Sequence, residues 1–194
     1  MAKEKTGDLH ELQQILKMEL NAKKKNHLIK QQNKIMKQLL RRLAFQIFLL
    51  VADADGTIDP KEVAQFRKFL TDRQNTCQSK YTRRIYHSTV VNFSTLLGHY
   101  HTERIKKDIN QVSKTLGYVE LCVPSDTMAE ICSDLEQLAV GIAEASGGML
   151  GLKSPISKAE QAVIDQLKEV FEHSIENAKG QDPKIREFFD FLNF

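Results

Sequence analysis

The residues that decide the fold are Ala52-Asp53-Ala54-Asp55-Gly56-Thr57-Ile58-Asp59-Pro60-Lys61-Glu62, which lie between two apolar segments. Gly56 can adopt a positive φ at little steric cost, as a tight turn requires. After it, Asp59 is a favourable helix N-cap, Pro60 suits the first helical position, and Glu62 completes a capping box. The stretch therefore predicts a helix–turn–helix junction.

Hydrophobic residues recur with a helical period through most of the chain, and strict alternation is rare. The segment from residue 35 to the junction is hydrophobic on most sides, which is typical of a central core helix. The expected helices begin near residues 8, 35, 60, 79, 102, 125, 157 and 182. Two glycines, Gly98 and Gly117, are expected to end the two middle helices, and residues 118–123 are expected to form an extended connector. The prediction is an all-α helical bundle with a long N-terminal helix.

Residues 138–167 repeat the plan of residues 44–70. In each copy an isoleucine precedes a capping residue, and a glutamate follows that isoleucine by four positions. Apolar residues then recur at matching offsets, Phe66 with Ile164 and Phe69 with Leu167. We therefore expect two pseudo-symmetric helix-turn-helix halves.

The charge of the chain is distributed unevenly. Of the 194 residues, those between Leu20 and Ala52 include eight basic and no acidic side chains, although the formal net charge is only +3. We expect residues 1–34 to form a basic helical extension and residues 35–194 to form the helical domain. The basic residues are candidates for binding a partner or an anionic surface: Lys23, Lys24, Lys25, Lys30, Lys34, Lys37, Arg41 and Arg42. They are not interleaved with aromatics, so nucleic-acid binding is not expected.

Several function classes find no support in the sequence. No nucleophile motif, Walker motif or Rossmann motif occurs, so we expect a non-enzymatic protein without a small-molecule substrate. Three widely spaced cysteines fit a reducing compartment. Neither a secretory signal nor an apolar run of about 20 residues is present. We expect a cytoplasmic protein.

The acidic junction also resembles an oxygen-ligand site for a divalent cation, calcium or magnesium. With Gly56 at the sixth position of an EF-hand loop, most ligand positions are filled, but Val51 offers no carboxylate at the first. The candidate ligands are Asp53, Asp55, Thr57, Asp59 and Glu62. Three interpretations stay open: a turn that only caps helices, a divalent-cation site, and a degenerate EF-hand.

The string Ala52–Glu62, placed after an apolar helix, resembles the signature of the tellurite-resistance TerB-like family, and the weaker second copy resembles that family's two-part layout. The resemblance covers about residues 35–174. The second copy departs from the pattern, because Ser146-Gly147-Gly148 replaces Ala-Asp-Gly. The resemblance implies an all-α fold, conditional metal binding, a stress-related or membrane-associated context at the inner membrane, and no reaction.

The C-terminus is dense in aromatic residues, and an exposed aromatic patch is typical of a partner site. The candidates there are Phe188, Phe191 and Phe194. The leading hypothesis is a scaffold or adaptor that binds protein partners. The alternative is a structural subunit of a larger assembly, attached through its basic N-terminal and aromatic C-terminal helices.

Overall fold

The computed structural model describes Lys34 and residues 38–56, 58, 60–77, 79–121, 123–146 and 156–180. The chain divides into two units, Met1–Lys37 and Gln38–Phe194. Apart from Lys34, every described residue belongs to the second unit. The expected N-terminal extension and the expected helix from residue 182 lie outside the described residues, so both stay predictions.

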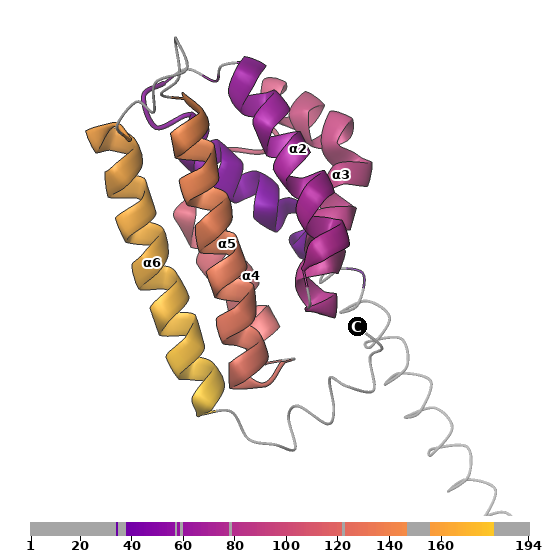
Figure 1. The fold of residues 1–194 in the computed structure, drawn as a ribbon, viewed down its shortest axis with the longest axis vertical. Helices are drawn as coiled ribbons and strands as arrows, with labels where there is room; N and C mark the ends of the chain where they lie inside the picture. Colours follow the sequence, from indigo (N-terminus) through magenta and orange to yellow (C-terminus); the bar gives the residue numbers. More distant parts are fainter. Residues whose placement is uncertain are drawn as a thin grey trace, which may run out of the picture. The chain divides into compact units, whose positions relative to one another are not determined.

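The second unit is an all-α bundle, as the sequence predicted (Figure 1). No strand occurs among the described residues. A helix over residues 38–52 comes first. It is followed by α2 (Pro60–Thr76), α3 (Lys80–His101), α4 (Ile109–Glu120), α5 (Ser125–Ser146) and α6 (Lys158–Lys179). Helix α5 packs against both α6 and α2, while α2 also packs against α3, and α4 against α6.

The helix over residues 38–52 forms the centre of the core. Every residue from 43 to 49 is buried, so all sides of this part of the helix are covered. Two of its aromatic rings pack against neighbouring helices. Phe48 stacks on Phe66 of α2 with 4.5 Å between ring centroids, and Phe45 meets the edge of Phe93 of α3 at 6.0 Å. This agrees with the expected central core helix.

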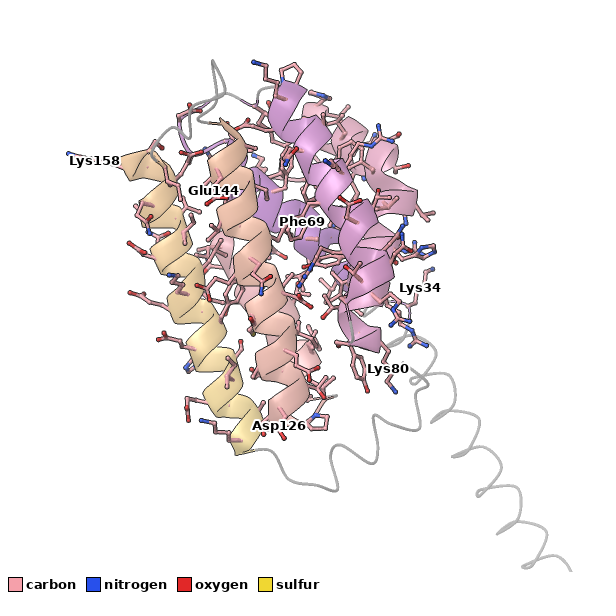
Figure 2. The ribbon with its side chains drawn as sticks, viewed as in Figure 1. Lys34, Phe69, Lys80, Asp126, Glu144 and Lys158 are labelled. Carbon is pink, nitrogen blue, oxygen red and sulfur yellow. The ribbon has the colours of Figure 1, made fainter. Side chains whose placement is uncertain are left out.

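A glycine allows α2 and α5 to approach each other. A Cβ atom added at Gly141 of α5 would lie 3.6 Å from the ring of Phe69. The Phe69 side chain lies between the two helices (Figure 2). Further along this interface, Arg73 of α2 pairs with the Asp134 carboxylate of α5, and the Tyr86 hydroxyl of α3 donates to the Asp134 carbonyl at 3.0 Å.

The expected boundaries of the two middle helices were wrong. Helix α3 continues through Gly98 to His101, because a single exposed glycine costs a helix only about 1 kcal/mol. Residues 102–108 are a connector, and α4 begins after Asp108, whose carboxylate accepts from the Asn110 N–H at 2.9 Å. The expected helix start near residue 102 was therefore too early, because residues 102–108 are not helical.

The expected extended run at residues 118–123 was also wrong, since its first half is the last turn of α4. The β-branched residue of this turn, Val119, continues a helical stripe. Val112, Leu116 and Val119 are buried at spacings of four and three, while Tyr118 is exposed. Gly117 lies within the helix and does not end it. Tertiary packing of one apolar face outweighs the local strand preference.

Both helix starts in the predicted repeat carry a buried glutamate in the first turn, Glu62 in α2 and Glu160 in α6. The capping box at Ser157 is confirmed. The Glu160 N–H donates to Ser157 Oγ at 3.1 Å, and the Ser157 N–H donates to Glu160 Oε2 at 2.8 Å. The pseudo-symmetry of the two halves stays a prediction.

Candidate functional site

The acidic junction begins with a tight turn. The Gly56 N–H donates to the Asp53 carbonyl at 3.3 Å, and Gly56 has a φ of 90°. This positive φ is the backbone conformation that the sequence predicts for Gly56, because glycine adopts it at little steric cost. The junction therefore starts as predicted, directly after the helix over residues 38–52.

A lysine from a distant connector binds Asp53. Lys107 Nζ donates to the Asp53 carbonyl at 2.6 Å and lies 3.1 Å from Asp53 Oδ2. The Tyr100 hydroxyl donates to the same carboxylate oxygen at 3.2 Å. Desolvation by burial, and then the Asp53 carboxylate, raise the pKa of Tyr100 above its ordinary value. An ammonium group and a phenol thus already satisfy Asp53.

The other predicted metal ligands are placed differently. Asp55 is exposed, and Glu62 is only 3% exposed in the first turn of α2. Thr57 and Asp59 lie outside the described residues. Within the described part of the chain, no group of three or more His, Cys, Asp or Glu side chains is gathered as a metal site. Cation binding by all five residues stays a prediction.

Of the predicted basic surface, the structure describes three residues, Lys34, Arg41 and Arg42, and all three are exposed. The remaining candidates for partner or anionic-surface binding lie outside the described residues: Lys23, Lys24, Lys25, Lys30, Lys37, Phe188, Phe191 and Phe194. Where the structure describes helices, none has both the length and the apolarity of a membrane span.

The structure also contains a pocket of about 370 Å³ that no motif in the sequence indicates. Its walls come from the start of the helix over residues 38–52, the connector between α3 and α4, and the first turns of α4. Leu39 and Ile105 give it an apolar part. Its polar lining includes Arg42, Gln46, Glu103, Arg104, Lys106 and Asp108.

The connector that forms this pocket has a defined backbone. The Glu103 N–H donates to the Tyr100 carbonyl at 2.9 Å, and the Arg104 N–H donates to the His99 carbonyl at 2.8 Å. These two bonds make a Schellman motif, with Glu103 at the position that usually holds glycine. Its φ is 56°, the only positive value of a non-glycine residue among those described.

A second buried acid lies between α4 and α6. Glu120 is 9% exposed, and its Oε1 accepts from Asn177 Nδ2 at 3.4 Å. Its Oε2 has no hydrogen-bond partner among the described residues. Desolvation by burial raises the pKa of Glu120, although Asn177 and His173 partly oppose this. Burial, and then the Glu120 charge, raise the pKa of Cys132 to about 12, so this thiol is a poor nucleophile.

Comparison with protein-family models, with curated proteins and with solved structures gave no match to this chain. The assignment of a function therefore depends on the residues of this chain and on their arrangement.

Proposed function

We propose that this chain is a non-enzymatic adaptor that binds protein partners through charged helix faces, in keeping with its resemblance to the TerB-like family. The observation that carries the proposal is the separation of charge within the bundle. Helix α3 has three basic and no acidic residues, whereas α5 has five acidic and no Lys or Arg residues. In Figure 2 Lys80 marks α3, while Asp126 and Glu144 lie toward the two ends of α5.

Two of the three basic residues of α3, Lys80 and Arg84, share a face with an exposed apolar residue. Lys80, Arg84, His87 and Val91 are all exposed and follow the spacing of one helix face. Val91 is 67% exposed, more than any other large hydrophobic residue in the described part of the chain. An exposed apolar side chain on the same helix face as two cations fits a partner segment that combines acidic residues with one apolar residue.

Helix α6 carries a face of negative charge, opposite in sign to that of α3. Asp165, Glu169, Glu172 and Glu176 are exposed and also recur on one helix face. Helix α6 packs against the acidic helix α5. Two helix faces of opposite sign would let one chain hold two partners of opposite charge, which is the task of an adaptor.

The test compares the partners of the full-length chain with those of two charge reversals, by proximity labelling in its native cell. Arg84→Glu reverses a charge in the α3 stripe, and Lys114→Glu reverses an exposed lysine of α4. We expect Arg84→Glu to remove a defined set of labelled partners that Lys114→Glu keeps, with both variants folded by circular dichroism. Identical partner sets for both variants and the unaltered chain would contradict the proposal.

A second candidate is a cation-responsive adaptor. The position of Lys107 favours it, because an ammonium group already binds the Asp53 carbonyl and carboxylate oxygens that a divalent cation would use. In this hypothesis calcium or magnesium displaces Lys107, and Asp55 and Glu62 supply further oxygens.

Thermal unfolding of metal-stripped protein tests this candidate, with and without millimolar calcium, magnesium, manganese or zinc. A cation at a hundredfold excess over its dissociation constant stabilises the folded state by about 2.7 kcal/mol. The shift should grow in Lys107→Met, which removes the competing ammonium, and disappear in Asp55→Asn with Glu62→Gln. If no cation shifts the unaltered protein or Lys107→Met, the junction serves only as a capping turn.

A further inference from the structure

The pocket beside the α3–α4 connector brings three cationic side chains together. Arg42 comes from the helix over residues 38–52, and Arg104 and Lys106 come from the connector. All three are exposed, and none forms an ion pair with another described residue. Like charges repel each other at close quarters, and an anion between them would relieve that repulsion.

A buried amide forms part of the same pocket. Gln46 lines it, is only 6% exposed, and has a carbonyl oxygen Oε1 without a hydrogen-bond partner among the described residues. A buried polar group without a partner destabilises the fold. Rotation of the terminal amide can present either its oxygen or its nitrogen to the pocket. A ligand with polar groups would provide the partner that the protein itself does not.

The acidic residues of the pocket narrow the class of ligand. Asp108 already caps α4 through the Asn110 N–H, so the start of this helix offers little attraction to an anion. Glu103 is exposed at the pocket and can accept hydrogen bonds. Its backbone has a positive φ, a conformation that is rare for glutamate and is concentrated at functional sites. An inorganic anion without hydrogen-bond donors, such as sulfate, would leave Glu103 unused.

We infer that this pocket binds a small organic phosphate or carboxylate that also carries O–H or N–H donors. Arg42, Arg104 and Lys106 bind the anionic group, while Gln46 and Glu103 bind the polar remainder. The volume of about 370 Å³ lies within the range of small-molecule pockets. This ligand class goes beyond the proposed adaptor function, which depends on α3 and α6 and would survive if the pocket were inert.

The test is isothermal titration of the full-length protein with four probes at matched ionic strength: adenosine monophosphate, ribose 5-phosphate, citrate and inorganic phosphate. Arg104→Gln removes one cation of the pocket, and Lys114→Gln removes an exposed lysine of α4 that does not line it. We expect at least one organic anion to bind more tightly than inorganic phosphate. Arg104→Gln should weaken that binding at least tenfold, and Lys114→Gln should leave it unchanged. No binding of any probe, or an equal loss in the two variants, would overturn the inference.

Gln46→Met provides a second readout, because methionine keeps the length of the side chain and removes its amide. If the Gln46 amide serves to bind a ligand, Gln46→Met should unfold at a higher temperature than the unaltered protein when no probe is present. The same variant should bind the organic anion more weakly. An amide with a purely structural role would instead make Gln46→Met unfold at a lower temperature, and that result would also overturn the inference.

Discussion

Lys107 binds Asp53 at two oxygens, 2.6 Å from its carbonyl and 3.1 Å from its carboxylate. The two residues are 54 positions apart in the chain. The contact joins the connector before α4 to the end of the central helix over residues 38–52. The turn that follows this helix is thus held by a distant residue as well as by its local hydrogen bonds.

Replacing Lys107 with methionine should lower the free energy of unfolding by about 1 kcal/mol, the value of one hydrogen bond with a partly exposed ion pair. The Lys107 side chain is 46% exposed, so salt should screen part of the effect. Urea unfolding at low and high salt measures both quantities, with Lys114→Met as the control for loss of an exposed lysine. A loss of the same size in the control would show that the contact with Asp53 contributes nothing.

Two substitutions at positive φ should change stability in opposite directions. Glu103 has a φ of 56° and Gly56 a φ of 90°. Glu103→Gly should therefore stabilise the protein, and Gly56→Ala should destabilise it, each by about 1 kcal/mol. An added Cβ at Gly56 would meet no atom within 4 Å, so backbone strain alone produces that loss. Urea unfolding of both variants is the measurement, and changes of the same sign would contradict the backbone argument.

Much of the fold could be predicted from local chemistry. Apolar residues at helical spacing gave the central helix, and Ser157 with Glu160 gave the start of α6, because a capping box depends only on residues within one turn. The start of α2 was predicted from Pro60 and Glu62 in the same way. In each case the deciding interactions lie close together in sequence.

The candidate site could not be predicted in this way. The helix expected from residue 102 includes residues 102–108, although Asp108 before Ile109 is itself a recognisable N-cap. Even with that signal, nothing local indicates that Lys107 contacts Asp53 or that Arg104 and Gln46 line one pocket. These pairings follow from the packing of the helices, which no spacing in the sequence encodes.

The aromatic cluster should be the most sensitive part of the core. Phe66 has no exposed surface, and its ring lies within 6.5 Å of the rings of Phe45, Phe48 and Phe93. Phe66→Ala removes these contacts and leaves a cavity, so it should reduce the free energy of unfolding by about 3–5 kcal/mol. Val91→Ala, at an exposed position, should change it by less than about 0.5 kcal/mol. Similar losses for the two variants in urea unfolding would contradict the packing described for Phe66.

Glu120 should make stability depend on pH. Because burial raises its pKa, the folded protein holds this proton at pH values where the unfolded chain has released it. As the pH rises from the unfolded pKa, near 4.5, through the higher folded pKa, the folded state loses stability. Above the folded pKa, the folded protein bears the full free-energy cost of holding the Glu120 carboxylate charged and partly desolvated. Glu120→Gln removes the titrating group, so it should stabilise the protein more at high pH than at pH 4.

The measurement is urea unfolding of Glu120→Gln and the unaltered protein from pH 4 to pH 8. His173, Ser174 and Asn177 also act on the Glu120 carboxylate, and each lowers its pKa. All three are present in both proteins, so the difference between the two curves reports the Glu120 carboxylate together with its interaction with His173. Glu169→Gln, which removes an exposed carboxylate on α6, is the control. A difference for Glu120→Gln that is constant with pH, or that has its greatest stabilising effect at pH 4, would contradict a raised pKa.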